Sequence, residues 1–278
     1  WNRHAMTDST VKELNYGRAL VGAILIARWL GRERRNDSMI GLLLPASVGG
    51  ALANIGTMLC GKVPINLNFT AGPENITSAC EQCEIRTVIT SKLFLKRAKL
   101  EEPAGVVYLE DLLPTFGAVA KAMAVVQARL LPAGLLLRLL GGARTQPGDL
   151  ATIVFSSGSS GAPKGVMLSH RGLIANVDAA QQVFQINPTD VVAGLLPLFH
   201  SFGFSYNLWF PLMAGIRVAF HANPLDAKAV GELVEKHRVT ILLGTPTFLR
   251  NYMRACTEQQ FASLRLVIAG AEKLPSRL

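Results

Sequence analysis

The sequence predicts an α/β fold in which two mainly parallel β-sheets are flanked by helices. Short β-branched apolar runs alternate with longer segments of helical spacing, and Gly or Pro stands at many of the junctions. Because successive parallel strands need a crossover, usually a helix, this alternation is typical of parallel sheets. The alternation occurs in two series, which predict subdomains at residues 1–145 and 146–278 of one domain.

The first series opens with a helix expected over residues 11–35. This helix ends in an arginine cluster, which suits the negative C-terminal end of a helix dipole. The strands of this series are expected at 38–45, 62–67 and 87–90, and its other helices at 48–59 and 74–83. Residues 116–142 differ, because they are rich in Ala, Leu and Val and carry three basic residues but no acidic one. Such a segment suits an anionic membrane surface or a core-packed helical pair, and the sequence leaves both open.

The second series follows a Gly- and Pro-containing linker at 141–148. Its strands are expected at 150–155, 166–170, 190–196, 216–220, 240–244 and 264–270, and its helices at 171–184, 205–213, 226–237 and 248–256. Ligands of open α/β sheets bind outside the carboxyl ends of the strands. The turns that follow these strands are therefore where we expect a site.

Composition and charge limit the classes of partner. The chain has 278 residues, half of them hydrophobic, which suffices for a sizeable core, and its net charge of +9 predicts an anionic partner. A nucleotide or a membrane surface fits this charge. Nucleic acid is not expected, because no basic motif interleaved with aromatic residues occurs.

The cysteines predict a cytoplasmic protein with reduced thiols. Cys80 and Cys83 form a C-x-x-C pair, but no second ligand pair stands nearby, so we expect no metal site. No apolar run reaches the roughly 18 residues that span a bilayer. Since the sequence starts at Trp1 without an initiator Met, we expect a piece of a longer protein.

A Ser- and Gly-rich loop at 156–165 follows the strand at 150–155 and is the strongest motif. Its backbone N–H groups and one lysine predict a phosphate cradle. The spacing fits neither the Walker loop nor the G-x-S-x-G elbow, and a plain flexible linker is disfavoured by the strand before it. The residues expected to contact phosphate are Ser156, Ser157, Gly158, Ser159, Ser160, Gly161 and Lys164.

This loop resembles the phosphate-loop signature of the adenylate-forming acyl ligases, which ends in Gly-x-Pro-Lys-Gly. Three later segments resemble the same superfamily in the same order. The resemblance implies that His200 faces the carboxylate or the adenylate phosphate, with Lys164 as the other catalytic residue. It places the acyl group at Phe199, Phe202, Gly203, Gly244 and Thr245, and the adenine at Gly270, Ala271 and Glu272.

Several longer phrases resemble the bacterial acyl-acyl-carrier-protein synthetases joined to 2-acylglycerophosphoethanolamine acyltransferases. These phrases lie at 61–72, 108–111, 196–203 and 264–274. The resemblance implies ATP- and Mg²⁺-dependent activation of a long-chain fatty acid, transfer to the thiol of an acyl-carrier protein, and reacylation of a lysophospholipid. Coenzyme A is the alternative acceptor. The same resemblance also implies a peripheral position at the inner membrane, with residues 116–142 touching lipid.

The resemblance also indicates what should lie beyond residue 278. The Tyr-Gly-x-Thr-Glu segment, which provides the main Mg²⁺ ligand, the ribose-binding Asp and the small mobile domain are expected there, so the fold is incomplete and the chain alone is expected to be inactive. A fatty acyl-CoA or acyl-AMP ligase and a non-catalytic lipid-binding module remain as alternatives. His221 and Asp226 match the H-x-x-x-x-D pattern of glycerolipid acyltransferases, but so short a pattern favours a chance match.

Overall fold

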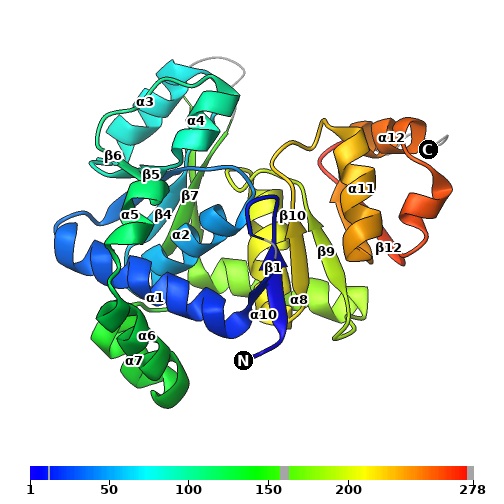
Figure 1. The fold of residues 1–278 in the computed structure, drawn as a ribbon. Helices are drawn as coiled ribbons and strands as arrows, with labels where there is room; N and C mark the ends of the chain where they lie inside the picture. Colours follow the sequence, from blue (N-terminus) through cyan, green and yellow to red (C-terminus); the bar gives the residue numbers. More distant parts are fainter. Residues whose placement is uncertain (12, 157–162, 274–278) are drawn as a thin grey trace. The chain divides into compact units, whose positions relative to one another are not determined.

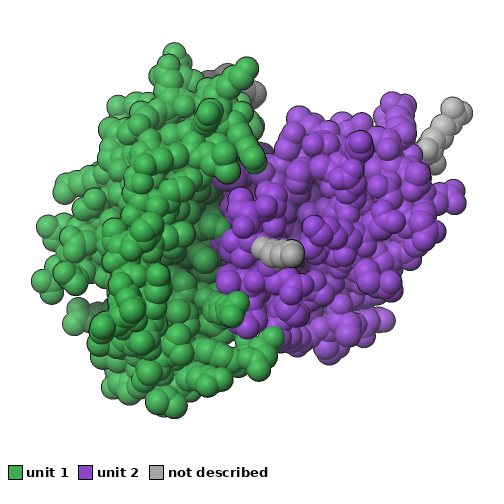
Figure 2. Space-filling model, in the orientation of Figure 1, with its two compact units in different colours: residues 1–2, 16–44, 49–174 green, residues 3–15, 45–48, 175–278 purple. Residues whose placement is uncertain are grey.

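The computed structural model describes residues 1–11, 13–156 and 163–273. It divides the chain into two compact units, coloured separately in Figure 2. Unit 1 comprises residues 1–2, 16–44 and 49–174, and unit 2 comprises residues 3–15, 45–48 and 175–278. The predicted α/β class with mainly parallel sheets is confirmed. The bounds of the compact units differ from those of the subdomains predicted at 1–145 and 146–278. Residues 3–15 belong to unit 2, and unit 1 extends to Ile174.

Unit 1 contains a parallel four-stranded sheet in the order β4-β3-β5-β6 (Figure 1). These strands are β3 (Met39–Leu43), β4 (Val63–Asn66), β5 (Val88–Thr90) and β6 (Val106–Tyr108). The helices are α1 (Tyr16–Glu33), α2 (Val48–Leu59), α3 (Pro73–Gln82), α4 (Lys92–Ala98), α5 (Leu109–Thr115), α6 (Ala118–Leu130) and α7 (Ala133–Leu140), followed by the short 3-10 helix η1 (Gly142–Arg144). Apolar side chains of α1 and β3, among them Ile24, Leu30, Ile40 and Leu42, are fully buried in one core cluster.

A two-stranded antiparallel hairpin completes unit 1. It consists of β7 (Leu150–Phe155) and β8 (Gly165–Ser169), and the loop at 156–165 connects them. The hydroxyl of Thr152 donates a hydrogen bond of 2.7 Å to the carbonyl of Pro64 in β4. This bond ties the hairpin to the parallel sheet.

Unit 2 contains a six-stranded sheet in the order β12-β11-β9-β10-β1-β2. Its strands are β1 (His4–Thr7), β2 (Leu14–Asn15), β9 (Val191–Gly194), β10 (Arg217–Phe220), β11 (Ile241–Gly244) and β12 (Leu266–Ala269). All neighbours are parallel except β1 and β2. The helices are α8 (His170–Phe184), which begins in unit 1, then α9 (Ser201–Gly203), α10 (Phe210–Ala214), α11 (Ala227–His237) and α12 (Pro246–Ala255), with a 3-10 turn η3 (Glu258–Phe261).

Two expected elements differ in the structure. The helix expected at 205–213 is a π-helix over Phe204–Trp209 that continues into α10. The helix expected from residue 11 starts at Tyr16, because the preceding residues pair as β1 and β2. Segment 116–142 forms α6 and α7, which are separated at Pro132. Among the described residues no helix is both long and apolar enough to cross a membrane.

Candidate active site

The base of the predicted phosphate loop is a closed hairpin in unit 1. Phe155 pairs with Gly165, and one residue further on the Ser156 N–H donates to the Lys164 carbonyl at 2.9 Å. Both Ser156 and Lys164 are exposed. The other predicted phosphate contacts lie outside the described residues, namely Ser157, Gly158, Ser159, Ser160 and Gly161. The described part therefore presents Ser156 and Lys164 to solvent at adjacent positions.

A small cavity of about 230 Å³ opens beside this hairpin. It is lined by Phe155, Ser156 and Pro163 from the hairpin and by Asn68 and Asn75 from the segment around α3, among others. The side chain of Gln82 at the end of α3 donates to the carbonyl of Pro163 at 3.1 Å. The end of the loop is thereby fixed to α3, and the cavity has polar side chains on the α3 side.

In unit 2, the predicted residues gather at the carboxyl ends of three neighbouring parallel strands. His200 follows β9, Thr245 follows β11 and Gly270 follows β12, and β11 lies between the other two strands in the sheet. The Gly270 N–H donates to the Gly244 carbonyl at 3.1 Å and extends the β11–β12 pairing by one step. Because parallel α/β sheets bind ligands at this edge, the arrangement suits a small-molecule site. We call it the carboxyl edge.

The amino ends of the same three strands are held by a buried acidic residue. Asp190, just before β9, is only 2% exposed. Its carboxylate accepts hydrogen bonds from the Thr240 hydroxyl before β11, at 2.7 Å, and from Arg265 Nε before β12, at 2.8 Å. This network fixes the register of β9, β11 and β12 and so positions the loops at their other ends.

His200 stands immediately before α9, next to a buried aromatic residue. Its ring centroid lies 4.6 Å from that of Phe199, which is 3% exposed. His200 keeps a solvent-facing edge, while burial of the rest of the ring lowers its pKa. Since the usual histidine pKa is about 6.5, the imidazole is neutral at pH 7. A neutral imidazole both donates and accepts hydrogen bonds.

Gly203 and Gly270 both stand where a neighbouring group approaches closely. A Cβ atom on Gly203 would lie 2.1 Å from the Pro197 carbonyl oxygen, so only glycine fits there. A Cβ on Gly270 would lie 3.1 Å from Cε1 of Phe202. The Phe202 ring also meets Tyr206 edge to face, with centroids 5.3 Å apart. Gly203 is buried, so its place in the structure is that of a positioning residue.

The turn after β12 is held by a carboxylate and has a strained backbone. Oε2 of Glu272 accepts hydrogen bonds from the Thr247 hydroxyl at 2.7 Å and from the Thr247 N–H at 3.3 Å. The hydroxyl bond is the main cause of the lowered pKa of Glu272. Ala271 has φ of 65°, a left-handed conformation that costs a non-glycine residue energy and is enriched at functional sites. Thr245 caps α12 by accepting from the Phe248 N–H.

In the H-x-x-x-x-D match formed by His221 and Asp226, the aspartate has a structural role. The Asp226 side chain accepts a hydrogen bond of 3.1 Å from the Ala229 N–H and so caps α11. His221 is half-buried, and burial lowers its pKa despite the opposing charge of Asp226. A capping role accounts for Asp226 without an acyltransferase reaction.

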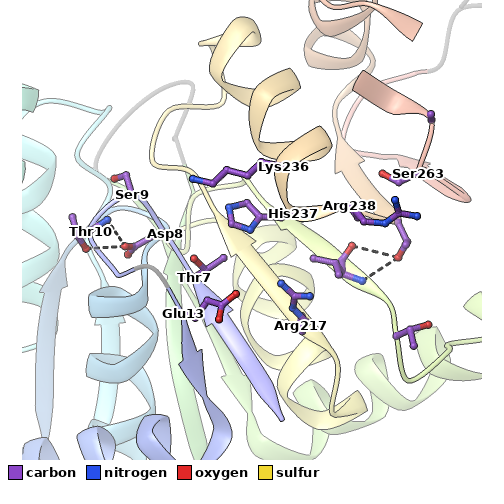
Figure 3. Close-up of a pocket in the computed structure, with 14 residues that line it drawn as sticks. Thr7, Asp8, Ser9, Thr10, Glu13, Arg217, Lys236, His237, Arg238 and Ser263 are labelled. Carbon is purple, nitrogen blue, oxygen red and sulfur yellow. Dashed lines mark hydrogen bonds between the residues drawn. The ribbon is translucent and has the colours of Figure 1, made fainter. Parts of the chain in front are cut away.

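The structure also contains a polar cavity that the sequence did not indicate. It has a volume of about 1360 Å³ in unit 2, and Figure 3 shows Lys236 extending toward Ser9 and Asp8. Arg217, Lys236 and Arg238 line it, but none of the predicted site residues does. The basic residues come from the start of β10 and the end of α11, at the opposite end of the strands from the carboxyl edge. No motif marks these residues, because segments far apart in sequence provide them.

The described residues offer no group of three or more His, Cys, Asp or Glu side chains that could hold a metal ion. The four cysteines are free. Burial is the main cause that raises the pKa of Cys60 and of Cys80 to about 11, so both are protonated thiols at neutral pH.

Comparison with known proteins gives the class. The AMP-binding enzyme family profile matches residues 2–278, and the chain belongs to that family. It is 27% identical to 3-hydroxybenzoate--CoA/4-hydroxybenzoate--CoA ligase of Thauera aromatica and 28% identical to 4-coumarate-CoA ligase 1 of Narcissus pseudonarcissus. Each alignment covers 97% of this chain but 50% and 49% of the relative, so the chain spans about half the length of these proteins.

Solved structures agree with the fold. O-succinylbenzoate coenzyme A synthetase from Bacillus subtilis, in complex with AMP, superposes with a TM-score of 0.79 at 20% identity. The match covers 100% of this chain and 66% of that chain. At this identity the likeness establishes the fold, which matches the N-terminal domain of adenylate-forming enzymes.

Proposed function

We propose that this chain carries the nucleotide- and acyl-binding residues of a ligase that activates a long-chain fatty acid with ATP. A carboxylate is a poor electrophile. Attack of its oxygen on the α-phosphorus of ATP forms an acyl-adenylate and breaks the bond to pyrophosphate, which leaves. The observation that carries the proposal is the gathering of His200, Thr245 and Gly270 at the carboxyl edge of a chain from the AMP-binding family.

Residues of each unit have distinct tasks in this proposal. In unit 1, Ser156 and Lys164 bind the phosphates, and the positive charge of Lys164 offsets the negative charge that develops there. In unit 2, backbone groups of Gly270 and of the left-handed turn at Ala271 contact the adenine. Neutral His200 donates a hydrogen bond to the carboxylate or the adenylate phosphate. Mg²⁺ screens the phosphates when bound, and no group of side chains described here forms its cage.

The acyl group would lie against the aromatic side chains after β9. Phe202 is partly exposed and supplies apolar surface, whereas the buried Phe199 packs against the His200 ring. Gly244 and Thr245 follow the neighbouring strand. Phe202 owes its position to the missing side chain of Gly270, which links the proposed acyl and adenine positions.

The acceptor of the acyl group is a thiol. The phrases at 61–72 and 196–203 favour an acyl-carrier protein and a link to lysophospholipid reacylation at the inner membrane. Coenzyme A is the second candidate, because the relatives described above are named as CoA ligases. In both cases the thiolate attacks the carbonyl carbon of the acyl-adenylate and AMP leaves.

Calorimetric titration with acyl-sulfamoyl-adenosine analogues of graded chain length tests the proposal. We expect affinity to rise toward long acyl chains, and Lys164→Ala to lower it by about tenfold to a hundredfold. Lys96→Ala is the matched control, because Lys96 is an exposed lysine of the same unit and lies on α4.

Three outcomes would change the proposal. Tighter binding of a hydroxybenzoyl analogue than of any fatty acyl analogue would replace the fatty acid by an aromatic acid. Equal binding by wild type and Lys164→Ala would remove the phosphate role of Lys164. Binding of fatty acid without any contribution from the nucleotide would favour the non-catalytic lipid-binding module.

A further inference from the structure

The outer face of α6 carries large apolar side chains in the open. Val119 is 78% exposed, Met123 48%, Val126 53% and Leu130 73%. Their spacing places all four on one face of the helix. In a surface helix of a globular protein this face is normally polar.

The inner face of α6 is made of small residues. Ala124 is fully buried in the core, and Ala120 and Ala128 pack against that core. The helix lies along α1, as Figure 1 shows in green and blue. Large apolar residues gain the most from burial, yet here alanines are inside and the larger side chains are outside. The pattern indicates an apolar partner on the outer face.

Helix α7 also exposes large apolar side chains, although its buried face carries leucines too. Leu136 and Leu140 are buried, while Leu135 is 45% exposed and Leu139 59%. We call the six exposed side chains the apolar ridge: Val119, Met123, Val126, Leu130, Leu135 and Leu139.

The end of α7 is fixed to unit 1. A Cβ atom on Gly142 would lie 2.6 Å from the Leu59 carbonyl oxygen, and one on Gly141 would lie 3.2 Å from the Cys60 carbonyl oxygen. Such close approaches hold the two chain segments together. The ridge residues of α7 therefore belong to a positioned surface of unit 1, and those of α6 lie on a helix that packs along α1.

The surroundings of the ridge are basic. No acidic residue occurs between Phe116 and Gly148. A groove of about 450 Å³ lies beside α7, and its lining includes Arg28, Arg32, Arg35 and Arg138. Leu139 of the ridge also lines this groove.

The backbone carbonyls just beyond α1 are not the hydrogen-bond partners of these arginine side chains. Lys62 Nζ already donates to the carbonyls of Arg34 at 2.9 Å and Arg35 at 3.4 Å. Within the described part of the chain, neither an ion pair nor a hydrogen bond occupies the side chains of Arg28, Arg35 or Arg138. The groove therefore collects positive charge that the described residues leave uncompensated.

We propose that the apolar ridge and this arginine groove bind the surface of an anionic phospholipid membrane. The ridge enters the boundary between headgroups and acyl chains, and the arginines contact lipid phosphates, as amphipathic interfacial helices do. A second copy of the chain is a poor occupant, because a two-fold interface repeats the same basic patch on both subunits and so gathers like charges in one interface. The proposal adds a lipid-binding surface to the proposed ligase, but it does not depend on acyl activation.

Vesicle flotation tests the proposal with the whole 278-residue chain. We expect binding to vesicles of phosphatidylcholine with phosphatidylglycerol, weak binding to phosphatidylcholine alone, and release as salt rises. Leu130→Glu should lower the vesicle partition at least tenfold. Val183→Glu is the matched control, because Val183 on α8 is also 73% exposed but lies far from the ridge in sequence.

A second pair of variants tests the charge. Arg138→Glu should weaken binding to anionic vesicles, whereas Lys96→Glu, an equal charge change on α4, should not. Circular dichroism of each variant checks that it is folded. Glycerol phosphate in solution separates a lipid surface from a free phosphate ligand. Binding of glycerol phosphate that depends on Arg138, without vesicle binding, would overturn the membrane proposal.

Two further results would also overturn it. One is equal binding to neutral and anionic vesicles that Leu130→Glu leaves unchanged. The other is self-association in solution, without vesicle binding, that Leu130→Glu abolishes. Because vesicle binding and adenylate-analogue binding are measured separately, failure of one proposal is distinguishable from failure of the other.

Discussion

The phosphate-loop hairpin of unit 1 and the carboxyl edge of unit 2 hold their predicted site residues in different ways. In the hairpin, Ser156 and Lys164 are exposed, and the backbone bond between them fixes their place. At the carboxyl edge, Gly203 is buried against a carbonyl and Gly270 faces an aromatic ring. The first region presents side chains that are free of the core, and the second builds its loops from packed residues.

This difference predicts which mutations change stability together with ligand binding and which change ligand binding alone. Changes at the carboxyl edge should alter stability and ligand binding together, because the same atoms pack and position. Changes to the exposed side chains of Ser156 and Lys164 should alter binding alone. Three substitutions test the division, and a fourth, Asp190→Asn, tests the network at the amino ends of the same strands. They follow from the largest expected effect on stability to the smallest.

Gly203→Val should destabilise unit 2 by at least about 3 kcal/mol, since the new side chain meets the Pro197 carbonyl and the backbone must move. Hydrogen exchange of the β9, β11 and β12 amides measures the effect within unit 2. Gly148→Val is the control, because nothing lies within 4 Å of a Cβ at Gly148. Equal protection in the two variants would show that the close approach at Gly203 is not needed.

Asp190→Asn should destabilise unit 2 by about 2–4 kcal/mol, because it removes the charge that Arg265 pairs with. Burial alone would raise the pKa of Asp190, but hydrogen bonds from Arg265, the Asn187 N–H and Thr240 outweigh it and lower the pKa. A lowered folded pKa stabilises the protein above the unfolded value of about 3.9, and this contribution disappears as pH falls through the folded value.

Urea denaturation between neutral and acidic pH checks this dependence. The difference in unfolding free energy between wild type and Asp190→Asn should be constant at neutral pH and shrink below about pH 4. A difference that stays constant into acid would mean that Asp190 acts through shape instead of charge.

Much of the fold was predictable because strand and helix patterns are local. The helix at 48–59 matches α2 over its whole length, and the strands around residues 39–43 and 241–244 were expected within two residues. Strand β1 was missed because it has four residues and pairs with β10, more than two hundred positions away. No local pattern encodes such a partner.

The candidate site was less predictable than the fold. Short motifs placed His200, Thr245 and Gly270 after strands, but the contact between Phe202 and Gly270 depends on strand order, which the sequence leaves open. Segment 116–142 left a core-packed pair and a membrane surface as alternatives. Composition could not decide between them, because the faces of α6 are separated by size, with alanines inside and larger apolar residues outside.

Gly270→Ala should cost about 1 kcal/mol, because the Phe202 ring must move by a few tenths of an ångström to admit a methyl group. We also expect the preferred acyl length of adenylate analogues to change, since Phe202 is proposed to line the acyl group. Phe202→Leu in the same chain should recover the lost stability. Unchanged stability and unchanged acyl preference would show that the Phe202 loop after β9 and the Gly270 loop after β12 do not depend on each other.

Lys164→Ala should leave stability within about 0.5 kcal/mol of wild type, as expected for an exposed side chain away from packed features. Its backbone carbonyl still accepts from the Ser156 N–H, so the base of the hairpin is kept. Urea denaturation and hydrogen exchange of β7 and β8 measure this directly. Loss of nucleotide binding at unchanged stability would distinguish the hairpin from the carboxyl edge, where Gly270→Ala changes both. If Lys164→Ala instead lost protection in β8, the lysine would be part of the packing of unit 1, and the two regions would hold their residues in the same way.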